Sequence, residues 1–351
     1  MVADALLAKE KFTIRELAGL IGLMSEYSKG VEYGMGHYRH LEHLKVAGLR
    51  QNKGSFDAFI SLSSSAAEDI NWWKINISKG IRRIWTSSPS ITLTTDSSGY
   101  AWGVVFSEGD NSLLEKKKTG GDWAWEDAIL HINVKETKAI WIGLRTFCAH
   151  LSHCCIKIET DSTTALAYVN HQGGMRNKDC DVLARQIWDF AQTRDLWLLG
   201  AYIPGVKNTE ADHESRLKYN TEWALPQKVF NLLQKKWGPF SCDLFASFLT
   251  FKMKPFVSWT PAPGALYVDA FSRKIMTNSF AFPPFSLITR TVRKVQRESS
   301  SCFLLTPRWR AQPWFGLLQR TTLLTEDLGI ISLENPVSKA KWSLHLVLWR
   351  I

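Results

Sequence analysis

The middle third of the sequence predicts an α/β fold in which helices flank a mixed five-stranded sheet. Three observations lead to this prediction. Short runs of alternating apolar and β-branched residues recur between residues 91 and 203. Segments with helical periodicity separate the later runs. Turn-forming residues end the runs, as in the Asp-Ser-Ser-Gly segment at 96–99 and at Pro204–Gly205.

Five strands are expected here, at residues 91–95, 102–106, 128–132, 155–160 and 196–203. The first two form a hairpin. Helices are expected at residues 133–149, 162–169, 181–194 and 209–217, and Asn133 can cap the first of them. The Lys- and Gly-rich segment 108–122 is expected to be a solvated loop.

The first 88 residues predict a mostly helical region. Thr13 and Glu16 form a capping box at the start of one helix, and further helices are expected at 37–49 and 65–84. His37, His40 and His43 recur every third residue. This spacing is compatible with a metal site, but no carboxylate accompanies the histidines, so an exposed helix face is the favoured interpretation.

Composition excludes several classes of protein. The chain has 351 residues, of which 45% are hydrophobic, which is enough for two or three globular domains. No apolar run reaches membrane-spanning length and no signal-peptide core is present, so we expect an intracellular protein of the cytoplasm or nucleus, with no membrane partner and not secreted.

The cysteines point to the same compartment. The six cysteines form no CxxC pair, which favours reduced core thiols. A zinc site made of His150, His153, Cys154 and Cys155 is the alternative, although a second ligand pair is lacking.

Positive charge is concentrated in the last third of the chain. Residues 1–220 hold 26 of the 43 Lys and Arg and 26 of the 33 Asp and Glu, so residues 221–351 hold the other 17 and 7 and the whole excess of +10. Such asymmetry favours a nucleic-acid partner for this part. Arg290, Arg293, Lys294 and Arg297 recur at near-helical spacing and are weak candidates for phosphate contacts, with a solvated helix face as the alternative.

Four acidic residues of the middle third are candidate metal ligands: Asp96, Glu136, Asp161 and Asp212. Taken alone, Asp96 fits a turn and Glu136 fits the first turn of a helix. Four carboxylates at one edge of a sheet would repel one another unless cations neutralised them. Oxygen ligands suit Mg²⁺ or Mn²⁺, and two such ions about 4 Å apart serve phosphodiester cleavage.

Four motifs around these acids resemble the acidic motifs of retroelement ribonuclease H, in order and in spacing. They are TDSSG at 95–99, HINVKETKAI at 131–140, TDSTTALAYVNHQGG at 160–174 and IPGVKNTEADHESR at 203–216. The resemblance implies a ribonuclease H-like domain at 89–220 that cleaves RNA in RNA–DNA hybrids and uses the four acids to bind two ions. It also implies that Asn208 orders the last loop, that Ser97 and Ser98 lie near the scissile strand, and that Arg176 contacts substrate.

The flanking segments are similar to DIRS-type retroelements, which encode a tyrosine recombinase. Residues 1–88, with FTIRELAGLIGLMSE and ISLSSSAAEDINWW, resemble the connection that follows a reverse-transcriptase palm. Residues 221–325, with CDLFASFLTFKMKPFVSW, YVDAFSRK, FAFPPF and LLTPRWRAQPWF, resemble the methyltransferase-like segment of these elements. Residues 326–351 resemble neither and are expected to be a tail of unknown role.

The sequence departs from these families in several places. No Tyr-x-Asp-Asp palm motif is present, and Tyr202 replaces the His that often precedes the last Pro-Gly. The loop after Val169 has only Arg176 and Lys178 to grip a hybrid. Phe282 precedes Pro-Pro where methyl transfer needs a hydrogen-bond acceptor, which argues against a methyltransferase. The missing palm and the tail keep open the alternative of a catalytically inactive, nucleic-acid-binding relic.

Overall fold

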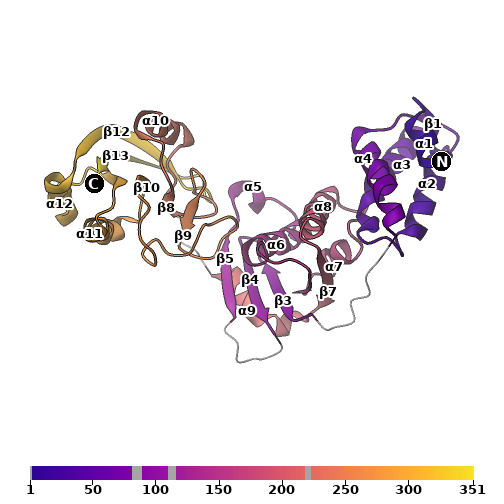
Figure 1. Cartoon of the computed structure of the whole chain (residues 1–351), viewed down its shortest axis with the longest axis horizontal. Coiled ribbons are helices and arrows are strands. Elements are labelled where there is room, and N and C mark those ends of the chain that lie inside the picture. Colours follow the sequence, from indigo (N-terminus) through magenta and orange to yellow (C-terminus); the bar gives the residue numbers. More distant parts are fainter. Residues whose placement is uncertain (1, 81–88, 110–115, 218–222) are drawn as a thin grey trace.

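The computed structural model describes residues 2–80, 89–109, 116–217 and 223–351. Three units follow one another along the molecule (Figure 1): an N-terminal unit of helices at one end, a central unit built on a sheet, and a C-terminal unit built on a second sheet at the other end. Within the described residues, no helix combines the length and the hydrophobicity needed to cross a bilayer.

The N-terminal unit, residues 2–79, is helical as expected. Thr13 and Glu16 form the predicted capping box. The helix expected at 65–84 ends earlier, at Asn76, and residues 81–88, where the expected domain boundary falls, lie outside the described residues. Its elements are α1 (Val2–Leu7), β1 (Phe12–Thr13), α2 (Ile14–Tyr27), η1 (Gly34–Tyr38), α3 (Arg39–Gln51), β2 (Phe59–Ile60), α4 (Ser64–Asn76) and η2 (Ile77–Lys79).

The central unit, residues 91–217, confirms the predicted α/β fold with a mixed five-stranded sheet and flanking helices. The strand order is β5-β4-β3-β6-β7, in which β3, β4 and β5 are antiparallel and β6 and β7 run parallel to β3. Its elements are β3 (Ile91–Ser97), β4 (Ala101–Glu108), β5 (Lys117–Asp122), α5 (Trp125–Ala128), α6 (Ile132–Phe147), β6 (Cys154–Thr160), α7 (Thr163–Asn170), α8 (Lys178–Gln192), β7 (Leu196–Tyr202), η3 (Gly205–Lys207) and α9 (Thr209–Arg216).

The third strand of this sheet lies earlier in the chain than predicted. It is β5, in the segment expected to be a loop, whereas the expected strand at 128–132 is a turn between α5 and α6. An edge strand can keep its lysines in solvent, so a Lys-Lys start does not exclude it. The apolar residues that suggested a strand are solvent-exposed, with Ile129 at 79% and Ile132 at 42%.

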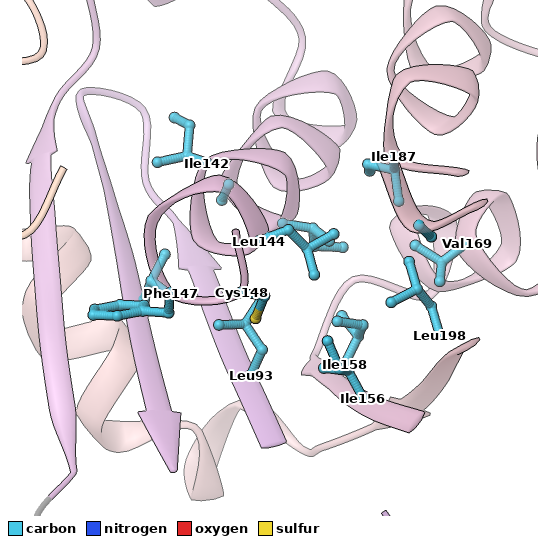
Figure 2. Packing of buried hydrophobic residues seen from close by; sticks show 14 of the residues in the cluster. Leu93, Ile142, Leu144, Phe147, Cys148, Ile156, Ile158, Val169, Ile187 and Leu198 are labelled. Atoms are coloured by element: carbon cyan, nitrogen blue, oxygen red, sulfur yellow. The ribbon is translucent and has the colours of Figure 1, made fainter. Parts of the chain in front are cut away.

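The main core lies between this sheet and helices α6, α7 and α8 (Figure 2). Leu93, Ile158 and Leu198 come from three adjacent strands and lie beneath the helices. The N-cap of α6 is His131, whose side chain accepts the Asn133 N–H, so Asn133 is not the cap that the sequence suggested. This core fixes β3 relative to α6.

The N-terminal unit is joined to the central unit by buried polar and aromatic contacts. The Tyr33 hydroxyl donates to the Leu196 carbonyl over 2.9 Å, and the ring packs against Trp188 and Trp197. His37 and His43 lie in this interface and are not on an exposed helix face: His37 Nε2 is 3.2 Å from Gln192 Oε1, and His43 Nε2 is 2.9 Å from a carboxylate oxygen of Asp181 on α8. The two units therefore share one packed boundary.

The C-terminal unit, residues 224–351, has a six-stranded sheet of order β12-β13-β11-β10-β8-β9. Strands β8 to β11 are parallel, and β13 is antiparallel to both β11 and β12. Its elements are α10 (Gln227–Trp237), β8 (Asp243–Ala246), β9 (Phe256–Ser258), β10 (Ser279–Ala281), η4 (Phe285–Leu287), α11 (Ile288–Glu298), β11 (Cys302–Pro307), α12 (Pro313–Thr321), β12 (Leu324–Glu334) and β13 (Lys341–Arg350).

The last 26 residues are part of this unit and are not a separate tail. Strand β13 lies inside the sheet and pairs with β11 from Phe303 to Pro307. Leu346, Leu348 and Trp349 of β13 are at most 3% exposed. The boundary expected at residue 325 therefore falls inside the long hairpin strand β12.

Candidate metal centre

Three of the four predicted acids lie together. Asp96 is in β3 and Asp161 directly follows β6, the parallel neighbour of β3, so both side chains reach the same edge of the sheet. Glu136 comes from α6, which packs over β3. One carboxylate oxygen from each residue lies within 4.8 Å of the other two. Among the described residues this is the single cluster of possible metal ligands, and the His150–Cys155 zinc alternative does not form one.

Burial makes this cluster unfavourable without a cation. Asp96 and Glu136 are 7% and 6% exposed. Burial, followed by the charges of Asp96 and Asp161, raises the pKa of Glu136 to about 9. Burial likewise raises the pKa of Asp96, with smaller contributions from Asp161 and Asp212. A bound cation would reverse this preference for the protonated forms.

The oxygen atoms of the cluster fit a hard divalent cation. Glu136 Oε2 is buried and has no hydrogen-bond partner among the described residues. A buried carboxylate oxygen without a partner is costly, and metal coordination is one way to satisfy it. The donors are carboxylates alone, the ligand type that Mg²⁺ and Mn²⁺ prefer.

Asp212, the fourth predicted acid, lies close to the cluster but points its carboxylate elsewhere. Its Oδ1 accepts the Nε–H of Arg216, four residues later in α9, over 2.7 Å. Asp212 is outside the three-residue cluster, yet its charge contributes to the raised pKa of Asp96. The structure therefore brings three of the acids into ligand distance and the fourth into the neighbourhood.

Asp96 is held by two side chains from the last segment of the central unit. Ser215 Oγ donates to Asp96 Oδ2, and Asn208 Nδ2 lies 3.4 Å from Asp96 Oδ1 and 3.1 Å from the Thr95 carbonyl. Asn208 is only 2% exposed, and through these contacts its side chain links the start of α9 to β3. Ser215 and Arg216 were missed by the sequence reasoning. Their one signal was the spacing of three and four residues after Asp212 in a short helix.

Two glycines allow the backbone to approach the site. A Cβ on Gly103 in β4 would lie 2.2 Å from the Ala211 carbonyl oxygen of α9. A Cβ on Gly205 would lie 2.9 Å from Asp161 Oδ2. The first glycine lets α9 lie on the sheet, and the second lets the Pro-Gly turn close over the carboxylate of Asp161.

The three residues predicted to contact substrate near the acids, Ser97, Ser98 and Arg176, differ in their exposure to solvent. Ser97 is buried beside Asp96, whereas the Ser98 hydroxyl is used inside the protein, donating to the Ser215 carbonyl over 2.8 Å. Arg176 is exposed before α8. Ser98 therefore ties the hairpin turn to α9, and its hydroxyl is engaged away from solvent.

One of the four basic residues of α11 is buried, and the other three are exposed. Lys294 is 6% exposed, and its ammonium lies 2.5 Å from Glu298 Oε1 and 3.3 Å from the Phe271 carbonyl. Its predicted role as a phosphate contact is therefore wrong, because it is buried and paired. Arg290, Arg293 and Arg297 are exposed.

No protein-family model matches the sequence, and no curated protein is significantly similar to it. Among solved structures, the chain is similar to ribonuclease H1 of the archaeon Halobacterium salinarum NRC-1, with 17% identity, 35% of this chain and 90% of that chain covered, and a TM-score of 0.28.

Two further solved structures are similar to part of the chain. One is LC11-RNase H1, isolated from compost, in complex with an RNA/DNA hybrid. It has 20% sequence identity and a TM-score of 0.29, and the match covers 35% of this chain and 91% of that chain. The foamy viral protease-reverse transcriptase in complex with RNA/DNA hybrid has 11% sequence identity and a TM-score of 0.23. This match covers 64% of this chain and 30% of that chain. None of these values assigns the chain to a family.

Proposed function

We propose that this chain is a divalent-ion-dependent nuclease of the ribonuclease H type, which hydrolyses RNA in RNA–DNA hybrids. The observation that carries the proposal is the cluster of Asp96, Glu136 and Asp161, whose carboxylate oxygens converge at one sheet edge. Asp96 and Glu136 are buried, and one oxygen of Glu136 has no hydrogen-bond partner among the described residues. A structural carboxylate cluster would be expected to pair with basic groups, as the surface acids Asp57 and Glu26 do. The four motif matches in order and spacing agree with this function.

Each side chain has a distinct part in the proposed reaction. Asp96, Glu136 and Asp161 would hold Mg²⁺ or Mn²⁺, two ions in the proposed state, with Asp212 as the fourth ligand. Bound ions would supply Lewis-acid activation of water and neutralisation of the leaving 3′-oxygen. Ser215 and Asn208 keep Asp96 in position through their hydrogen bonds. Ser97 lies beside the cluster, and Arg176, Arg290, Arg293 and Arg297 are exposed candidates for contacts with the nucleic-acid backbone.

A proposal for the evolutionary origin of the chain rests on the sequence resemblance of its flanking segments. We propose that it derives from a DIRS-type retroelement, with a connection-like N-terminal unit and a C-terminal unit that resembles the methyltransferase-like segment of those elements. Hybrid would be recognised through groove shape and 2′-hydroxyl groups, without sequence specificity.

The test is cleavage of a hybrid labelled on its RNA strand, with Mg²⁺ or Mn²⁺ and with EDTA. Wild type should cut the RNA, and Asp96→Asn and Glu136→Gln should not. Asp189→Asn is the control, because Asp189 on α8 is an exposed carboxyl of the same central unit and lies outside the cluster. If wild type binds hybrid and leaves it intact in both metals, the chain is a binding protein with a remnant site.

A further inference from the structure

A cavity of about 780 Å³ lies where the C-terminal unit meets the edge strand β5 of the central sheet. Its volume falls in the range of small-molecule sites, about 300–1,000 Å³. The two walls are tied together by Thr119 Oγ1 of β5, which donates to the Pro261 carbonyl over 2.7 Å. Leu217, the residue after α9, also lines the cavity. None of the three clustered acids does, so this is a separate site.

The cavity lies at a reversal of strand order. Strand β8 pairs with β9 on one side and with β10 on the other, and all three strands are parallel. After β8 the chain continues to β9, on one side, whereas after β10 it continues to β11, on the other side. The two connections therefore leave the carboxyl ends of the neighbouring strands β8 and β10 in opposite directions. Residues just after these ends, Ser247, Phe248 and Pro284, line the cavity. Open α/β sheets bind ligands at such a position.

The lining combines flat apolar walls with a few polar groups. Trp102, Phe245 and Phe271 contribute aromatic rings. The exposed Arg290 places its guanidinium carbon 3.9 Å from the Phe271 ring centroid, and it has no acidic partner among the described residues. A guanidinium stacked by its face keeps its N–H edges available for an anion such as a phosphate.

Two other polar residues line the cavity and are suited to bind the sugar or the base of a nucleotide. The carboxylate residue Asp269 lines the cavity, and so does Ser258, which is 1% exposed. Within the described part of the chain, the Ser258 hydroxyl makes no hydrogen bond. Carboxylate and hydroxyl oxygens can accept hydrogen bonds from ribose hydroxyls or base amino groups.

We propose that this cavity binds a nucleotide, with its flat base between the apolar walls and its phosphate at Arg290. A purely apolar ligand would leave the guanidinium of Arg290 without an anion, and a small anion would leave the aromatic walls empty. The same chemistry is offered by a free mononucleotide and by an unpaired nucleotide of a single strand, whose bases stack on aromatic side chains. The site does not depend on the proposed nuclease activity.

The test is titration calorimetry of the whole chain, in EDTA so that the carboxylate cluster is inactive. The probes are the four ribonucleoside 5′-monophosphates and an eight-nucleotide single-stranded RNA. Ala262→Trp fills the cavity from a partly exposed loop position, and Arg290→Glu reverses the charge at the phosphate position. Arg320→Glu is the matched control, since Arg320 is exposed on α12 of the same unit and does not line the cavity.

We expect wild type, Arg320→Glu and Asp96→Asn to bind alike, and Ala262→Trp and Arg290→Glu each to bind at least tenfold more weakly. Binding of mononucleotides identifies a free ligand, whereas binding of the strand alone identifies an unpaired nucleotide, and both support the proposal. Equal weakening by Arg320→Glu, or unchanged binding by Ala262→Trp, would show a general basic surface and overturn it. Absence of binding by both probes would also overturn it. Loss of hybrid cleavage in Asp96→Asn with nucleotide binding intact separates the two proposed functions.

Discussion

Arg216 and Asp212 form an ion pair one helical turn apart in α9, with 2.7 Å between Arg216 Nε and Asp212 Oδ1. The pair is what separates the fourth predicted ligand from the other three acids. It also places a positive charge beside a cluster that must attract cations, because the Arg216 charge lowers the pKa of Asp96.

Removal of this arginine should strengthen metal binding. In Arg216→Ala, the carboxylate of Asp212 is released and the local potential becomes more negative, so Mn²⁺ affinity measured by calorimetry should rise several-fold. Arg15→Ala is the control, because Arg15 is equally exposed at 67% and pairs with an aspartate, Asp57, outside the cluster. Unchanged or weaker Mn²⁺ binding in Arg216→Ala would show that the arginine orients Asp212 more than it opposes the ion.

Stability without metal should fall as pH rises. The folded-state pKa of Glu136 is about 9, raised chiefly by burial from an ordinary value of 4.5. A raised folded pKa means that the stabilisation from the protonated form is complete below pH 4.5 and is lost as pH rises toward 9. Urea unfolding in EDTA should therefore show wild type losing stability from pH 5 to pH 8, and Glu136→Gln losing less.

With metal bound, wild type should be stabilised more than Glu136→Gln. Mn²⁺ should raise the melting temperature of wild type at pH 8 and should raise that of Glu136→Gln much less, because one ligand is missing. The interpretation of the cluster as a metal site fails if Mn²⁺ stabilises both proteins equally.

Gly205→Ala should impair the metal centre without unfolding the protein. The added Cβ would lie 2.9 Å from Asp161 Oδ2, so the carboxylate or the Pro-Gly turn must move. We expect at least a tenfold loss of Mn²⁺ affinity by calorimetry, with an unchanged far-ultraviolet circular dichroism spectrum. Gly99→Ala is the control, since a Cβ there meets nothing within 4 Å. Equal Mn²⁺ affinity in both variants would mean that Asp161 adapts freely.

The C-terminal hairpin should be required for stability. Trp349 in β13 is 3% exposed, packs against Phe315 at 5.4 Å between ring centroids, and donates from Nε1 to Thr306 Oγ1 over 2.8 Å. Trp349→Ala should cost about 3–5 kcal/mol in urea unfolding. Ile330→Ala on β12, where the side chain is 75% exposed, should cost little. A small and equal effect of the two substitutions would mean that the hairpin is peripheral to the fold.

Short-range patterns in the sequence were enough to predict most elements of the central unit. The helix expected from residue 162 does begin there, with Ser162 as its N-cap, and the capping box of Thr13 in the N-terminal unit also formed, because a cap depends on contacts within one turn. The acids Asp96 and Asp161 were placed at strand ends from alternation and turn chemistry, whereas the pairing of these two strands is known only from the structure. The strand at 117–122 was missed because an edge strand tolerates lysine and glycine, so its local composition resembles that of a loop.

The tertiary structure decided which of these residues act together. It placed the charge of Asp212 near Asp96, brought the buried ammonium of Lys294 to the Phe271 carbonyl, and brought Ser215 to Asp96 from 119 residues away in sequence. It also made the last residues of the chain an internal strand, although they resembled nothing recognisable. The sequence by itself determined the fold class and the acidic residues, since periodicity and residue type are local. Side-chain partners and burial depend on elements far apart in the chain, and only packing brings those elements together.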